Sequence, residues 1–113
     1  MKTVSILKSG NEIAKAWNAN RYFLRLRGLL GRSLQEGGGL LLSPCGCIHT
    51  FGMRYAIDAV YLDRSGRVLR VDEALPKGRA WPGQKGAKRV LELPSGSAKR
   101  FSIQPGDLLE VVP

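Results

Sequence analysis

Short apolar runs separated by glycine- and proline-containing turns make up most of this sequence after residue 39. The runs cover residues 40–42, 48–53, 57–62, 67–75, 90–93, 98–103 and 108–112. Turn sequences such as Asp63-Arg64-Ser65-Gly66 separate them. Short strands at about ten-residue spacing are typical of an antiparallel sheet curled into a barrel or sandwich. We therefore predict an α+β, mostly β fold built on a small antiparallel barrel-like sheet.

The first 36 residues predict a hairpin followed by a helix. The apolar run 4–7 ends at Ser9-Gly10-Asn11, and residues 12–17 then alternate polar with apolar, although their alanines also suit a helix. Tyr22, Leu26, Leu29 and Leu30 have the spacing of a buried helical stripe. We predict one short helix over about residues 20–36, which would plug one end of the barrel or cover an edge.

Length and composition favour a single soluble domain over residues 1–113. The chain has 113 residues, enough for one ordinary hydrophobic core. No apolar run approaches the roughly 18 residues that a membrane helix needs. Lys8 interrupts the apolar N-terminal run, so we expect no signal peptide. A disulfide between Cys45 and Cys47 would close a strained ring, so we expect a reducing, cytoplasmic location.

The net charge of +9 would attract negatively charged partners, but the basic residues are spread along the chain, which favours a soluble protein that is basic without such a partner. Seven basic residues lie within residues 1–35, and five more lie in 76–89, an acid-free stretch that we predict to be a mobile loop around Trp81. An anionic ligand or an acidic protein would fit this charge. Single-stranded nucleic acid, bound by Arg25, Arg32 and Trp81, is a less favoured alternative, because no dense basic block or aromatic cluster is present.

Cys45, Cys47 and His49 share one side if this segment is an extended strand. A structural tetrahedral metal site needs a fourth ligand, and the chain has no other Cys or His, so we predict no metal and no cofactor. A thiol beside the only imidazole also suggests a nucleophile, with Cys45 or Cys47 activated by His49 and Asp58 orienting the ring. The alternative is a purely structural role, in which both thiols are small buried side chains and His49 is a hydrogen-bonded strand residue.

Two acids interrupt apolar runs, Asp58 within 56–60 and Glu92 within 90–93. A carboxylate in such a run must face solvent, meet a cation or accept hydrogen bonds. Arg54, or an arginine of the predicted helix, is a natural partner for Asp58. For both acids we favour a structural ion pair or a hydrogen-bond acceptor over catalysis.

Three ordered blocks of residues resemble the signatures of one protein family. They are Arg25-x-x-Gly28-Leu29-x-x-Arg32-x-Leu34, then Phe51-x-Met53 with Ile57-Asp58, Tyr61-Leu62-Asp63 and Gly66-x-Val68, and finally Val90-Leu91-Glu92-Leu93-Pro94-x-Gly96 with Gly106-Asp107. In this order they resemble the bacterial and archaeal family called domain of unknown function 192. The resemblance covers nearly the whole chain. It implies a single small β-rich domain and no particular activity.

Our prediction of function is a non-catalytic binding or accessory module with a pocket or groove near the histidine. Its predicted ligand-binding residues are Arg25, Arg32, His49, Arg54, Asp58 and Trp81. The alternative is a small hydrolase-like enzyme that uses Cys45, His49 and Asp58. A second alternative is binding of single-stranded nucleic acid or another polyanion.

Overall fold

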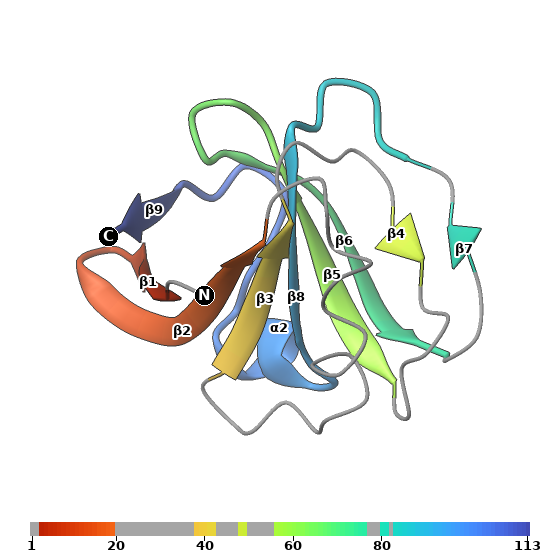
Figure 1. The fold of residues 1–113 in the computed structure, drawn as a ribbon, viewed down its shortest axis with the longest axis horizontal. Helices are drawn as coiled ribbons and strands as arrows, with labels where there is room; N and C mark the ends of the chain where they lie inside the picture. Colours follow the sequence, from red (N-terminus) through yellow and green to blue (C-terminus); the bar gives the residue numbers. More distant parts are fainter. Residues whose placement is uncertain (1–2, 20–37, 43–47, 50–55, 77–79, 82) are drawn as a thin grey trace.

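The computed structural model describes residues 3–19, 38–42, 48–49, 56–76, 80–81 and 83–113. A seven-stranded sheet dominates this part of the chain and curls into a half-barrel (Figure 1). Its strands are β1 (Thr3–Lys8), β2 (Asn11–Ala19), β3 (Gly38–Leu42), β5 (Ile57–Leu62), β6 (Val68–Leu75), β8 (Arg89–Pro94) and β9 (Leu109–Val112). The spatial order is β6-β5-β8-β3-β2-β1-β9. Two shorter strands, β4 (Ile48–His49) and β7 (Ala80–Trp81), pair separately.

The fold class is mostly β, as predicted, and the described residues contain one short helix. The hairpin of β1 and β2 forms around Ser9 and Gly10, and the runs 40–42, 57–62, 67–75, 90–93 and 108–112 are strands with ends shifted by at most two residues. The sheet departs from the prediction in one pair, because β2 and β3 are parallel. The connection over residues 20–37 is long enough for the crossover that a parallel pair requires. The predicted helix over about 20–36 lies outside the described residues.

The predicted strand over 98–103 is wrong, since α2 (Ser97–Arg100) begins there. Two contacts turn the chain out of the sheet after Pro94. The hydroxyl of Ser97 donates to Pro94 O at 2.6 Å, and the carboxylate of Asp58 accepts the N–H groups of Gly96 and Ala98. These tertiary hydrogen bonds outweigh the weak strand pattern of the segment. No helix among the described residues is long and apolar enough to cross a membrane.

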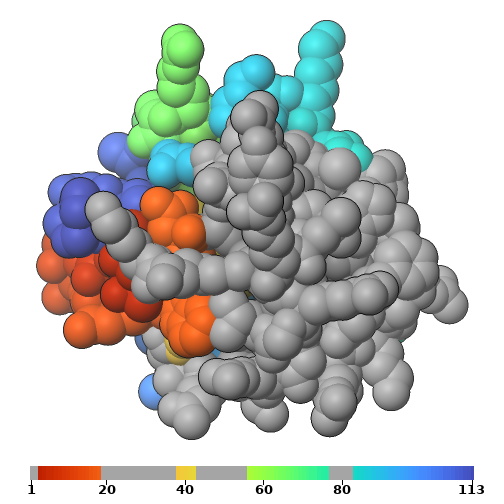
Figure 2. Space-filling model, viewed as in Figure 1, coloured from red at the N-terminus to blue at the C-terminus, as the bar shows by residue number. Residues whose placement is uncertain are grey.

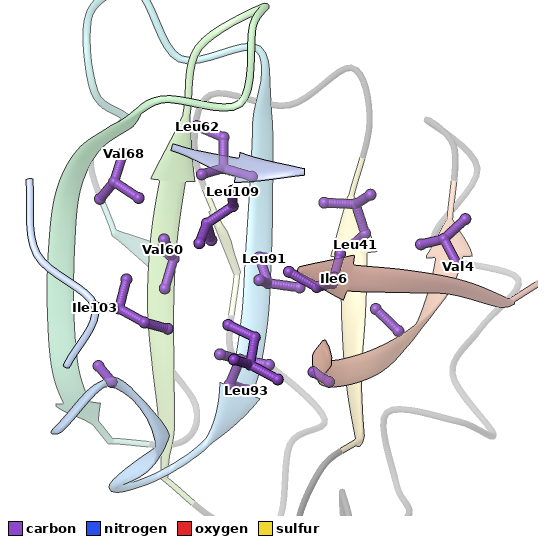
Figure 3. Close-up of a cluster of buried hydrophobic side chains, with 14 residues drawn as sticks. Val4, Ile6, Leu41, Val60, Leu62, Val68, Leu91, Leu93, Ile103 and Leu109 are labelled. Atoms are coloured by element: carbon purple, nitrogen blue, oxygen red, sulfur yellow. The ribbon is translucent and has the colours of Figure 1, made fainter. Parts of the chain in front are cut away.

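The hydrophobic core lies inside the curl of the sheet (Figure 3). Alternate residues of the central strands point into it, as Val60 and Leu62 do from β5 and Leu91 and Leu93 from β8. The start of β9 closes the curl by hydrogen bonding back to the turn before β6, with Leu109 N–H donating to Gly66 O at 2.9 Å. Gly66 has φ +97°, and a Cβ there would collide with Leu109 O, so only glycine fits this approach.

The opposite face of the central strands is also buried, since all six residues of β5 are inaccessible. Ala59 and Tyr61 alternate with the core residues and therefore point to this second face, as Glu92 does from β8. A register shift in β6 places Val68 and Val71 both against the core. Arg70 and Asp72 consequently lie on the second face, whereas strict alternation along the strand would place them on the same face as Val68.

Candidate functional site

Asp58 belongs to the scaffold. Its buried carboxylate accepts three backbone hydrogen bonds, from Ala74 N–H to Oδ1 at 2.9 Å and from Gly96 and Ala98 N–H to Oδ2 at 3.0 and 2.9 Å. It thereby joins a bulge in β6 to the start of α2. The hydrogen-bond acceptor role favoured from the sequence is the one that the structure has, and both oxygens face backbone amides.

The other predicted site residues are placed only in part. Arg25, Arg32, Cys45 and Arg54 lie outside the described residues, as does Cys47. The backbones of His49 and Trp81 are described: His49 pairs with Ala80, and Ile48 pairs with Trp81, in the β4–β7 ladder. The stretch 76–89, predicted to be irregular throughout, therefore contains a short strand that brings the backbone of Trp81 beside that of Ile48. The described residues contain no group of three or more His, Cys, Asp or Glu that could hold a metal.

Glu92 is a buried acid whose carboxyl group is not satisfied by the described residues. It lies in the middle of β8, between Leu40 of β3 and Ala59 of β5, and is 1% exposed. Its Oε2 atom has no hydrogen-bond partner among the residues that the structure describes. An unmet buried polar group of this kind costs about 1–3 kcal/mol. Burial raises the pKa of Glu92 from its ordinary value of 4.5 to about 8, so the carboxyl group is mostly protonated at neutral pH.

An ion pair lies on the same face, one strand beyond Ala59. Arg70 Nε donates to Asp72 Oδ1 at 2.8 Å, and Arg70 Nη2 lies 2.7 Å from Asp72 Oδ2. The guanidinium also stacks over the Tyr61 ring, 5.1 Å from its centroid. The side-chain hydrogen bond to Asp72 raises the pKa of Arg70 above its ordinary value. The pair is therefore held in a fixed, bidentate geometry.

Register places this pair in line with the buried acid. Ala59 is the Cα partner of Asp72 on one side and of Glu92 on the other, so the two acids share one row across the sheet with only a methyl side chain between them. Their strands are two apart, which separates the two backbones by about 10 Å. We call Arg70, Asp72 and Glu92 the polar row. Side-chain exposure falls along it, from 32% at Arg70 and 17% at Asp72 to a residue exposure of 1% at Glu92.

Sequence reasoning had singled out Glu92 but assigned it a structural role. The signal was the acid inside the apolar run 90–93. Arg70 and Asp72 carried no such signal, because an arginine and an aspartate two residues apart on an edge strand usually face solvent. Their place beside Glu92 depends on the β6–β5–β8 register, which no local pattern contains.

Comparison with known proteins places the chain among uncharacterised relatives. The model of the family DUF192, described as an uncharacterized ACR, matches residues 4–111. This match confirms the resemblance seen in the sequence blocks. A similar curated protein is a UPF0127 protein of Thermococcus kodakarensis, 29% identical in an alignment 109 residues long that covers 88% of this chain and 69% of that protein.

Two solved structures resemble this fold. A protein of unknown function from Novosphingobium aromaticivorans has a TM-score of 0.77 at 20% identity, covering 96% of this chain and 83% of its own. A protein of Sinorhizobium meliloti, described as a candidate transcription regulator, has a TM-score of 0.71 at 22% identity, covering 96% of this chain and 92% of its own. At these identities the likeness shows the fold alone.

Proposed function

The chain belongs to the DUF192 family, whose description names no activity, and from its own residues we propose that it is a non-catalytic binding module. Its ligand is a small, uncharged molecule rich in hydroxyl groups, held against the second face of the sheet by the polar row. One observation carries this proposal: the buried Oε2 atom of Glu92 has no hydrogen-bond partner in the part of the chain that the structure describes. Buried polar groups in folded proteins nearly always have partners, so an exception points to a partner that comes from outside the chain.

The charge of the polar row favours an uncharged ligand. Arg70 and Asp72 neutralise each other, and Glu92 is mostly protonated at neutral pH. An ion that binds at the polar row would find no unpaired opposite charge among these three residues. A hydroxyl group would find both a donor and an acceptor in the protonated carboxyl, and further acceptors in Asp72. Sugars and other polyols combine these two properties.

The exposure gradient gives the ligand a direction of approach. Arg70 and Asp72 lie on β6, the edge strand, and remain partly accessible. Glu92 lies two strands further in and is closed to solvent. A ligand would therefore meet the ion pair first and the buried acid last. Such a site, with few polar groups among apolar neighbours, matches the usual make-up of small-molecule sites.

This proposal moves the predicted binding site away from Asp58. The scaffold uses both carboxylate oxygens of Asp58, which supports binding over an enzyme in which Asp58 orients His49. Contributions of Arg25, Arg32, His49, Arg54 and Trp81 to ligand binding stay predictions.

Nuclear magnetic resonance titration with D-glucose and N-acetyl-D-glucosamine tests the proposal. At least one of these probes should shift the backbone amide signals of Ala59, Asp72 and Glu92, saturating at millimolar concentration. Glu92→Leu removes the donor and the acceptor and should abolish the shifts, whereas Glu92→Gln keeps one of each and should weaken them. The control Glu73→Gln changes an exposed carboxyl on the same edge strand and should leave them unchanged. Shifts absent in the wild type, or equal in Glu92→Leu, would contradict the proposal.

A further inference from the structure

Two basic loops lie together at one end of the half-barrel. The turn 63–67 between β5 and β6 and the loop 83–88 before β8 rise side by side there (Figures 1 and 2). Lys88 N–H donates to Leu62 O at 2.8 Å, which fixes the second loop against the end of β5. The Nη2 atom of Arg89 lies 3.8 Å from the point that a Cβ on Gly66 would occupy. The two loops therefore form one continuous surface.

This surface carries a strong positive charge. We call it the basic end and define it by the cations Arg64, Arg67, Lys85, Lys88 and Arg89. Residues 63–67 and 83–89 contain one acid, Asp63, so five positive charges stand against one negative charge. The ion pairs among the described residues are Lys8–Asp107 and Arg70–Asp72, and neither uses a cation of the basic end. Four of the five cations are exposed.

The side chain of Asp63, the single acid, forms hydrogen bonds within its own turn. Asp63 Oδ1 accepts hydrogen bonds from the N–H and hydroxyl of Ser65 and from the N–H of Arg67, at 2.9, 2.7 and 2.9 Å. The hydrogen bond from the Ser65 side chain is the main cause that lowers the pKa of Asp63. Asp63 therefore serves to shape the turn, and the cations around it remain available to a partner.

The backbone that carries these cations is fixed before any partner arrives. Asp63 N–H donates to Arg67 O at 3.0 Å and Ala87 N–H to Gln84 O at 3.0 Å, and Arg67 Nη1 donates to Gly106 O at 2.7 Å. A rigid arrangement of charges loses less conformational entropy on binding than a flexible one. At about 0.1 M salt the Debye length is about 10 Å, so neighbouring cations on these loops act on a partner together.

From this charge and rigidity we infer that the basic end binds an acidic surface of another protein. Complementary charge steers such partners together and fixes their orientation. Proteins that hold single-stranded nucleic acid add aromatic side chains on which bases stack. Residues 63–67 and 83–89 contain no aromatic residue, so these loops offer positive charge without a stacking platform. The basic end is separate from the polar row, and its function does not depend on the proposed small ligand.

Fluorescence anisotropy with two labelled probes of equal charge tests this inference, a poly-glutamate peptide and a single-stranded oligonucleotide. The peptide should bind at about 50 mM salt and more weakly at about 200 mM. Lys85→Gln combined with Lys88→Gln should weaken peptide binding about fourfold, roughly twofold for each exposed ion pair lost. The control Lys15→Gln combined with Lys99→Gln removes the same charge from exposed sites elsewhere and should leave binding within about twofold.

Each outcome supports or overturns the inference. The inference is supported if the Lys85→Gln, Lys88→Gln variant binds the peptide more weakly and the Lys15→Gln, Lys99→Gln control binds it as the wild type does. Absence of peptide binding at the lower salt overturns it, as does equal weakening by both pairs, which would show only the effect of total charge. Tighter binding of the oligonucleotide than of the peptide overturns the protein partner in favour of nucleic acid. All four changed side chains are exposed, and circular dichroism confirms that both variants keep the fold.

Discussion

Burial of Glu92 should make the stability of this protein fall as pH rises. The folded state holds the proton of Glu92 up to a pKa of about 8, whereas the unfolded chain releases it near 4.5. Between these values the folded state binds more protons than the unfolded state, so the free energy of unfolding decreases with increasing pH. The loss of stability caused by Glu92 is absent below about pH 4.5 and complete above about pH 8.

The size of this effect follows from the two pKa values. A difference of one pKa unit corresponds to about 1.4 kcal/mol, so linkage gives a loss of roughly 3–4 kcal/mol between pH 5 and pH 8. Glu92→Gln cannot titrate, and its stability should lack this contribution. The apolar neighbours Leu40 and Ala59 offer no charge that would offset it, and the nearest described ions on this face are the paired Arg70 and Asp72.

Urea unfolding at pH 5, 6, 7 and 8 measures the effect in the wild type and in Glu92→Gln. Other titrating groups, His49 among them, are present in both proteins and cancel in the difference between them. That difference should change by roughly 3 kcal/mol across the range in favour of Glu92→Gln. A difference that stays constant with pH would show that Glu92 is ionised or well solvated in the folded protein. The charge argument for the polar row would then fail.

Two further predictions concern the scaffold. Asp58→Ala leaves the buried N–H of Ala98 and the partly buried N–H groups of Ala74 and Gly96 without an acceptor, and should lower the free energy of unfolding by roughly 2–4 kcal/mol. Asp58→Asn keeps one acceptor oxygen and should fall in between. A loss below about 1 kcal/mol in urea unfolding would contradict the scaffold role of Asp58. Gly66→Ala must place a Cβ against Leu109 O at φ +97°, and should lower the free energy of unfolding by more than about 2 kcal/mol. Gly10 also has a positive φ but open space around it, so Gly10→Ala should lower this free energy by about 1 kcal/mol. Equal losses for the two variants in thermal unfolding would contradict the steric argument.

The contrast between Asp58 and Glu92 shows where sequence reasoning stops. Both are single acids in apolar runs, and the sequence assigned them the same role. The runs themselves predicted strands β5 and β8 correctly, because apolar periodicity and turn residues are local signals. The role of Asp58 depends on hydrogen-bond partners that lie 16 to 40 residues away in the sequence. The role of Glu92 depends on the strands on either side of β8. Periodicity carries no information on such partners.

The same limit explains the errors in the predicted elements. The segment 98–103 alternates well enough for a strand, but hydrogen bonds from Gly96 and Ala98 to a distant carboxylate convert its start into α2. In β6, one extra residue near Leu69 moves Val71 to the core and Arg70 to the other face. Bulges of this kind follow from pairing with the neighbouring strand, so a single-sequence pattern predicts the strand without its faces.

The polar row and the basic end differ in charge, burial and expected salt dependence, so their functions can be measured separately. The row is electrically neutral and partly or fully buried, so its contacts depend on hydrogen bonding and should respond little to salt. The basic end is exposed and carries unbalanced charge, so its contacts weaken as salt increases. A leucine in place of Glu92 would continue the apolar run of β8 without the cost of a buried carboxyl. The general positive charge of the chain therefore accounts for the basic end at most, and the presence of Glu92 requires a separate explanation, for which we propose a ligand on the second face.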